Sequence, residues 1–207
     1  MNALLIIDVQ NDFCPGGALP VSEGDRIVPL INGLQERFDL VVATQDWHPA
    51  GHKSFASSHG KQPGEVIDLN GLQQILWPDH CVQGSAGAKF VDALRLGKID
   101  RIFQKGTDPE IDSYSGFYDN GHRKATGLAG YLKEKKVSTV YVTGLATDYC
   151  VKYTCLDAVR EGFRTVLIKD ACRGVNLNEG DAEAAVADMK KAGVIVLPGS
   201  EVPEQPA

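Results

Sequence analysis

The chain has 207 residues, 43% of them hydrophobic and 23% charged, which is the composition of a folded globular protein and excludes a largely disordered chain. Its 21 Lys and Arg residues against 27 Asp and Glu residues give a net charge of −6, which argues against nucleic acid or an anionic membrane as a partner. Five scattered cysteines without a CxxC pair, and an N-terminal apolar run too short for a signal peptide or a membrane span, predict a cytoplasmic protein.

Six short apolar segments rich in Val, Ile and Leu predict strands that are buried on both faces. They are residues 4–9, 40–44, 99–103, 139–142, 165–168 and 194–197. Apolar residues at helical spacing lie between them, at residues 27–38, 90–94, 122–136, 150–162 and 178–193. This alternation predicts an α/β, Rossmann-like three-layer fold with a six-stranded, mainly parallel sheet and helices on both faces. The tail at residues 200–207 is expected to be loose.

The segment at residues 45–85 departs from this alternation, because it has neither helical nor strand periodicity. It contains both tryptophans, four of the five histidines and one cysteine. Long irregular connections inside compact domains are uncommon and tend to carry function. This one leaves the carboxyl end of a predicted strand, where open α/β sheets bind their ligands. We therefore expect one domain over residues 1–207, with a functional loop region at about 45–85.

Three side chains of this loop region have the donor chemistry of a metal site. Asp46 and His48 are two residues apart on an extended chain and so point the same way, and His80 lies further along. Two imidazoles and a carboxylate suit Zn²⁺, with Fe²⁺ and Mn²⁺ as alternatives. The alternative interpretation is that these are loop histidines held by hydrogen bonds alone.

Three other polar residues end predicted strands or follow them. Asp8 interrupts the first apolar run, Lys105 follows the third, and Cys150 follows the fourth. Because parallel strands present their carboxyl ends at one edge of a sheet, we expect the three side chains to share a cleft. Asp8 would take the thiol proton there, and Lys105 would hold the thiolate. Taken singly, each has an ordinary alternative: an aspartate that caps a turn, a solvated lysine and an inert buried thiol.

Cys150 stands at the start of a predicted helix. With Thr147 as the N-cap, Cys150 falls in the first turn, where the helix dipole and a nearby cation favour the thiolate. The free backbone N–H groups of that turn face the same space and are suited to hold an oxyanion. The sequence therefore predicts a cysteine nucleophile, with its thiolate form favoured, next to free backbone N–H groups.

Six short motifs occur in order along nearly the whole chain. They are residues 8–13 (DVQNDF), 45–49 (QDWHP), 77–82 (WPDHCV), 105–106 (KG), 112–117 (DSYSGF) and 144–151 (GLATDYCV). As a set they resemble the nicotinamidase family of the isochorismatase-like cysteine hydrolase superfamily. The resemblance implies a metal-dependent amidohydrolase that converts nicotinamide to nicotinate and ammonia, a step of NAD salvage, through a thioester on Cys150. It also implies pyrazinamide as a second substrate.

The same resemblance implies a role for individual residues. The implied catalytic triad is Asp8, Lys105 and Cys150, and the implied metal ligands are Asp46, His48 and His80. The implied oxyanion hole is formed by the backbone N–H groups of Ala146 and Cys150, with a cis peptide bond between Leu145 and Ala146. Zinc is the expected metal, with iron and manganese as alternatives.

The resemblance further implies an aromatic substrate pocket. Its expected members are Phe13, Trp77 and Tyr118, with Leu19 as a further one. His52 lies where some relatives supply a fourth metal ligand, although three protein ligands with water are the preferred set.

Three other functions are consistent with parts of this pattern. An amidohydrolase that cleaves carbamoyl or ureido groups would use the same triad, but such relatives generally lack the metal residues. An isochorismatase attacks a vinyl ether without a cysteine nucleophile. A metal-binding or thiol-based sensor would have the site without turnover. The sequence leaves the oligomeric state open, a homo-oligomer included.

Overall fold

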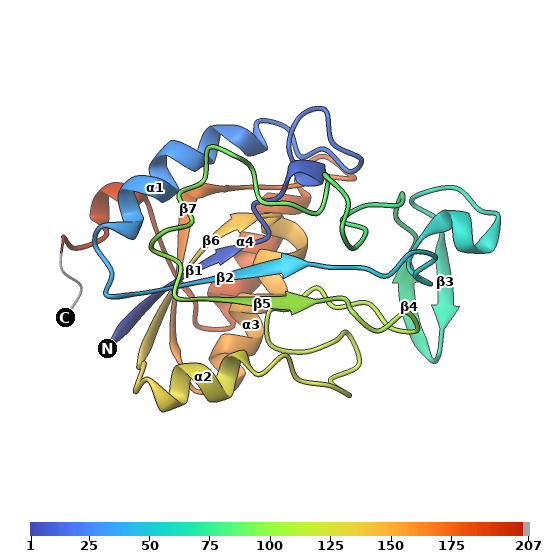
Figure 1. Ribbon diagram of the computed structural model, residues 1–207. Coiled ribbons are helices and arrows are strands. Elements are labelled where there is room, and N and C mark those ends of the chain that lie inside the picture. The colour runs from blue at the N-terminus through green and yellow to red at the C-terminus, as the bar shows by residue number, and fades with distance from the viewer. Residues whose placement is uncertain (205–207) are drawn as a thin grey trace.

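The computed structural model describes residues 1–204, and its centre is one six-stranded sheet (Figure 1). The strands are β1 (Asn2–Ile7), β2 (Leu40–Asp46), β5 (Arg101–Lys105), β6 (Thr139–Leu145), β7 (Arg164–Arg173) and β8 (Ile195–Leu197). Their order in the sheet is β5-β2-β1-β6-β7-β8, and every neighbouring pair is parallel. The predicted Rossmann-like α/β fold is thus confirmed, and its switch in strand order lies at β1.

Four α-helices cover the two faces of this sheet. They are α1 (Val28–Gln35), α2 (Leu128–Glu134), α3 (Lys152–Arg160) and α4 (Asp181–Lys191). One hydrophobic core joins α1 to its face, and a second core joins α2, α3 and α4 to the opposite face. Within residues 1–204, no helix is long and apolar enough to cross a membrane.

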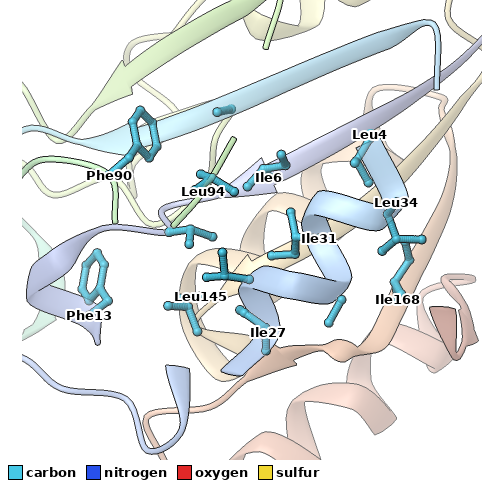
Figure 2. Packing of buried hydrophobic residues seen from close by; sticks show 14 of the residues in the cluster. Leu4, Ile6, Phe13, Ile27, Ile31, Leu34, Phe90, Leu94, Leu145 and Ile168 are labelled. Carbon is cyan, nitrogen blue, oxygen red and sulfur yellow. The ribbon is translucent and has the colours of Figure 1, made fainter. Parts of the chain in front are cut away.

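The core beneath α1 follows from the spacing of its apolar residues. Ile27, Ile31 and Leu34 recur at helical intervals and point toward the sheet (Figure 2). Ile6 and Leu145 meet them from the strands, and all five side chains are at most 1% exposed. Burial of an aliphatic side chain of this size contributes about 1.5–3 kcal/mol. This packing fixes β1 and β6, whose carboxyl ends border the site described below.

The helix predicted at residues 90–94 is absent, and this segment runs alongside the end of β1 instead. Phe90 forms an antiparallel bridge with Gln10, and the backbone N–H of Val91 donates to the carbonyl oxygen of Val9 at 3.1 Å. Phe90, Val91 and Leu94 have near-helical spacing, which predicted a helix. The spacing is equally compatible with the observed irregular segment, because Phe90 and Leu94 are buried in it as they would be in a helix.

The loop region contains a β-hairpin that periodicity did not predict. Strands β3 (Val66–Leu69) and β4 (Leu72–Ile75) pair antiparallel around Asn70 and Gly71. Both turn residues have positive φ, 55° and 84°, as a two-residue hairpin turn of this kind requires. The Asn-Gly pair was therefore the feature of the sequence from which this hairpin could have been predicted. The hairpin projects beyond the carboxyl ends of β2 and β5 (Figure 1).

The part of the predicted loose tail that lies within the described residues is packed against the body. A 3-10 helix covers Gly199–Glu201, and the side chain of Val202 is only 3% exposed. The guanidinium of Arg37 donates to the carbonyl oxygen of Val202 at 2.7 Å. The prediction of a loose tail is wrong for these residues, and residues 205–207 lie outside the described part of the chain.

Candidate active site

Four neighbouring strands bring polar side chains to one edge of the sheet. Asp8 follows β1, Asp46 and Lys105 are the last residues of β2 and β5, and Cys150 follows β6. All four residues are buried, with exposed fractions of 0–7%. The sequence predicted that Asp8, Lys105 and Cys150 would meet, because the carboxyl ends of parallel strands share an edge, and the structure adds Asp46, predicted separately as a metal ligand, to the same group.

Asp8, Asp46, Lys105 and Cys150 form one cluster, in which the ammonium group of Lys105 contacts the other three residues. Its Nζ lies 2.9 Å from Oδ2 of Asp8 and 3.0 Å from Oδ1 of Asp46. It also donates to the carbonyl oxygen of Ser113 at 2.8 Å and lies 3.5 Å from Sγ of Cys150. Burial alone would lower the pKa of this amine, but the two carboxylates outweigh it and raise the pKa well above its usual value. Lys105 is therefore a fixed positive charge beside the thiol.

Asp8 is held in an unusual backbone conformation. Its φ of 47° is in the left-handed region, which side chains other than glycine rarely adopt and which tends to mark functional positions. Oδ1 accepts a hydrogen bond from the hydroxyl of Thr44 at 2.7 Å. Burial raises the pKa of Asp8 although Lys105 opposes the shift, and the charge of Asp46 adds to the rise. A carboxylate with a raised pKa is a better proton acceptor, as a general base requires.

Cys150 lies in a π-helical turn, Thr147–Val151, directly before α3. Ala146 is the N-cap residue of this turn, in place of the predicted Thr147, and the peptide bond between Leu145 and Ala146 is cis as the resemblance implied.

The protonation state of Cys150 differs from the sequence expectation. Burial raises the pKa of this thiol well above its usual value, and the positive charge of Lys105 offsets that only in part. The charges of Asp8 and Asp46 raise it further. The resting group is a thiol, and it needs a neighbouring base before it can attack. The sequence expectation that the helix dipole and the cation favour the thiolate left out the effect of burial, whereas the expectation that Asp8 takes the thiol proton stays a prediction.

Three donors converge beside this cluster. Nε2 of His48 lies 3.0 Å from Oδ2 of Asp46, and Nε2 of His80 lies 3.4 Å from the same oxygen. The Nδ1–H of His48 donates to the carbonyl oxygen of Gly106 at 2.9 Å, and that of His80 donates to the carbonyl oxygen of Pro78 at 2.8 Å. Both imidazoles thereby direct Nε2 inward, which is how backbone carbonyls orient histidines that bind metals.

The charges around these donors favour a cation. Burial would raise the pKa of Asp46, but His48 and Lys105 outweigh it and hold the pKa well below its usual value. Burial would likewise lower the pKa of His48, yet the carboxylate of Asp46 raises it. An anionic oxygen between two inward nitrogens, all three within 4.8 Å of one another, fits a divalent metal.

His52 is buried next to His48 but is committed to other partners. Its Nε2 donates to the carbonyl oxygen of Asp108 at 2.7 Å. Its Nδ1 accepts the backbone N–H of Ser54 at 3.0 Å and lies 2.8 Å from the hydroxyl of the same residue. Both nitrogens are therefore occupied, which supports the preferred set of three protein ligands over one that includes His52.

Gly106 is required for the position of His48. A Cβ at residue 106 would lie 2.5 Å from Cε1 of His48, and φ of Gly106 is +64°. Gly106→Ala should displace the imidazole and reduce the zinc retained after dialysis, measured by elemental analysis. Gly60→Ala is the matched control, because Gly60 has a φ of +62° and open space around it. Equal zinc retention in the two variants would contradict this account of Gly106.

A cavity extends from Cys150 to two of the metal donors, Asp46 and His80. It is lined by Phe13, Leu19, Asp46, Trp77, His80, Asp112, Tyr114, Ala146, Tyr149, Cys150 and Val175. Phe13, Trp77 and Leu19 therefore lie where the sequence expected an aromatic pocket. Tyr118 does not: its hydroxyl donates to Glu161 at 2.5 Å, and its ring stacks on His122.

Two other tyrosines occupy the wall expected of Tyr118. The ring of Tyr149 meets Trp77 edge to face, with centroids 4.9 Å apart and an interplanar angle of 88°. The indole N–H of Trp77 donates to the hydroxyl oxygen of Tyr114 at 3.1 Å. Aromatic side chains held in this way form a flat-sided slot suited to a planar ring.

Sequence reasoning missed several residues of the site although signals for them existed. Thr44 is two residues before Asp46 on β2, so it faces the same side of the strand. Asp112 and Tyr114 belong to a motif for which no individual role was predicted. Tyr149 precedes Cys150 in the sequence, is half-buried and lines the cavity.

Comparison with known proteins identifies the lineage of this site. The domain model "Isochorismatase domain" matches residues 2–201. The chain belongs to the isochorismatase family.

Within this family, the chain is similar to several enzymes with named activities. The nicotinamidase of Escherichia coli (strain K12) is 50% identical over 195 residues, which are 92% of each chain. The structure of an Acinetobacter baumanii nicotinamidase/pyrazinamidase superposes with a TM-score of 0.94 at 49% identity over 97% of each chain. The pyrazinamidase of Pyrococcus horikoshii, solved in complex with zinc, gives a TM-score of 0.79 at 39% identity over 95% of this chain and 98% of that one.

The isochorismatase-family match covers every residue of the cluster, of the metal donors and of the cavity wall. The recognition of this family from six short motifs is confirmed.

Proposed function

We propose that the protein is a metal-dependent cysteine amidohydrolase that converts nicotinamide to nicotinate and ammonia, and that it also accepts pyrazinamide. The observation that carries the proposal is the buried Lys105, which contacts Asp8, Asp46 and Sγ of Cys150, the last two of which line an aromatic-walled cavity. Nicotinamidases with about half of their residues identical to this chain support the substrate. A cytoplasmic location is part of the proposal, and five free cysteines, typical of proteins in a reducing compartment, support it.

The substrate ring is proposed to lie between the aromatic walls of the cavity. Phe13 and Trp77 flank the space, and Tyr114 replaces Tyr118 as the third aromatic side chain. Asp46, His48 and His80 would hold a divalent cation at one end, and Cys150 stands at the other. The bound cation would supply a Lewis acid that attracts the ring nitrogen. The ring would then be oriented with its carboxamide carbon toward Sγ.

The first chemical step is attack by sulfur. Asp8 takes the thiol proton, and the thiolate forms a bond to the carboxamide carbon while the carbonyl π electrons move to oxygen. The oxyanion is proposed to accept hydrogen bonds from the backbone N–H groups of Ala146 and Cys150. Lys105 keeps the sulfur and carboxylate charges compensated during the transfer.

The second step expels ammonia and then restores the thiol. Asp8 returns its proton to the amide nitrogen, the C–N bond breaks, and a thioester on Cys150 remains. Asp8 then takes a proton from water, whose oxygen attacks the thioester carbon. The oxyanion collapses, the C–S bond breaks, and the proton on Asp8 returns to sulfur, while nicotinic acid leaves and loses its remaining proton to water to give nicotinate. Each step uses a group that already lies in the cluster.

The identity of the cation forms a separate part of the proposal. Imidazole and carboxylate donors suit zinc, iron and manganese. The pyrazinamidase of Pyrococcus horikoshii was solved with zinc, which supports zinc as the first choice.

Ammonia release from nicotinamide, with and without a chelator, is the direct test. We expect turnover by the purified protein, loss of turnover after chelation and recovery on adding zinc, iron or manganese. His48→Ala should lower both the zinc content and the turnover, because it removes one of the two inward nitrogens. His122→Ala is the matched control, since His122 is an exposed imidazole that stacks on Tyr118. A protein that binds zinc without releasing ammonia would be a sensor and not this enzyme.

A further inference from the structure

Asp112 is the buried acid of the site that the proposed chemistry leaves without a role. It belongs to the motif at residues 112–117, and only 3% of it is exposed. It lines the same cavity as Asp46, His80 and Cys150. A buried carboxylate is expensive unless hydrogen bonds or an opposite charge compensate it, so its presence here requires an explanation.

The partners of Asp112 compensate it only in part. Oδ1 accepts the backbone N–H of Ser113 at 2.7 Å, and Oδ2 lies 3.4 Å from the amide nitrogen of Gln74. Among the described residues, Nε2 of His48 is the only basic nitrogen within 4.0 Å, at 3.9 Å from Oδ1. The ammonium group of Lys105 forms its ion pairs with Asp8 and Asp46 and not with Asp112.

The charge count of the site points the same way. The site contains three buried carboxylates, those of Asp8, Asp46 and Asp112, whereas Lys105 is the only buried lysine among the described residues and contacts the first two. A divalent cation at the Asp46, His48 and His80 donors would compensate the excess negative charge.

The position of Asp112 is beside the three donors and not among them. Its carboxylate groups with His48 and His52, whereas the primary set is Asp46, His48 and His80. The group with His52 is not a second centre, because both nitrogens of His52 are already bonded and His48 has only Nε2 to offer. Asp112 therefore lies near the inward Nε2 of His48, 3.9 Å from it, next to the donors that would hold the cation.

We propose that Asp112 is a positioning residue that raises the affinity of the cation site, through its charge and by accepting hydrogen bonds from water around the bound ion. The inference rests on the cation site of the proposed function but not on its turnover. Groups in this position hold the ligands and the solvent shell of metal sites, and their removal typically weakens metal affinity by about 10- to 100-fold.

A purely structural role for Asp112 makes a different prediction. The carboxylate orders Ser113, whose carbonyl oxygen accepts from Lys105, so Asp112 could serve only to shape that turn. Asparagine at residue 112 keeps an oxygen for the N–H of Ser113 and loses the charge. Asp112→Asn therefore separates the two roles, since a turn-shaping residue would leave the metal affinity unchanged.

The test is a zinc titration in competition with a chromogenic chelator, which reads affinity without any substrate. We expect Asp112→Asn to weaken zinc binding by about 10- to 100-fold. Asp157→Asn is the control, because it neutralises an equally buried aspartate that is paired with Arg160. It should change the zinc affinity by less than about threefold, because solvent and salt screen the effect of a distant charge.

Unchanged zinc affinity in Asp112→Asn would overturn the proposal, and so would an equal loss in Asp157→Asn. Asp112→Ser, whose hydroxyl can also accept from Ser113, replaces the first variant if that one does not fold by circular dichroism. Wild-type protein that binds zinc tightly but releases no ammonia would refute the proposed function and leave this inference intact. Wild-type protein that binds no zinc would refute both.

Discussion

Cys150→Ala is expected to abolish ammonia release while the protein stays folded and keeps its bound divalent metal. Loss of Sγ removes the atom that bonds to the carboxamide carbon, and nothing else in the cluster is a comparable nucleophile. Removal of a covalent nucleophile lowers kcat by about 10⁴- to 10⁶-fold. The substitution takes away one buried atom and leaves the contacts of Lys105 with both carboxylates in place. Steady-state ammonia release and elemental analysis measure the two halves of this expectation.

Cys155→Ala is the matched control for that experiment. Cys155 is a fully buried thiol on α3, five residues further along the chain, and it packs in the core beside Ala158. The control should lose some stability and keep its turnover number. Substantial turnover by Cys150→Ala would mean that water attacks the amide directly, and the thioester would have to be abandoned.

Lys105→Met is expected to have the largest effect on stability. Removing the ammonium group leaves Asp8 and Asp46 buried without the charge that both contact within 3.0 Å. Breaking a buried ion pair by deleting one partner costs about 3–5 kcal/mol. Methionine fills much of the same volume, so the free energy of unfolding reports the charge more than the packing. Urea denaturation in the presence of a chelator measures it, because a bound cation would itself compensate the carboxylates.

A second substitution tests the electrostatic explanation. In the double variant Lys105→Met, Asp8→Asn, one of the two uncompensated charges is gone, so part of the lost stability should return. Turnover should not return, because both the fixed positive charge and the base are missing. A single Lys105→Met variant as stable as the wild-type protein would show that the ammonium group does not compensate these carboxylates.

The edge of the sheet is the part of the site that could be predicted from the sequence. Asp8, Asp46, Lys105 and Cys150 each follow or end an apolar strand, and parallel strands present such positions together without any knowledge of distant contacts. His48 and His80 could be predicted as metal ligands because imidazoles beside a carboxylate suit a divalent metal, and because the motifs that contain them resemble those of the nicotinamidase family.

The parts that were missed depend on side-chain direction and on contacts between distant segments. Tyr114 and Tyr118 are four residues apart in an irregular loop, where no periodicity says which of them faces the cavity. The protonation state of Cys150 depends on how deeply the fold buries the thiol, which the helix-start position does not reveal. The bridge between Phe90 and Gln10 joins segments 80 residues apart, so local spacing alone favoured a helix there.

The strand that carries Lys105 has a hydrogen-bonded neighbour on one side only, because β5 is one of the two edge strands of the sheet and pairs with β2 alone. Peripheral strands open more readily than central ones, and such local opening requires less free energy than unfolding the whole domain. Fraying of β5 would withdraw the ammonium group from between Asp8 and Asp46 while the other five strands stayed paired. Mild heating or low denaturant should therefore inactivate the protein reversibly before its spectroscopic unfolding begins, and amide exchange along β5 should be faster than along the central strands β2, β1 and β6.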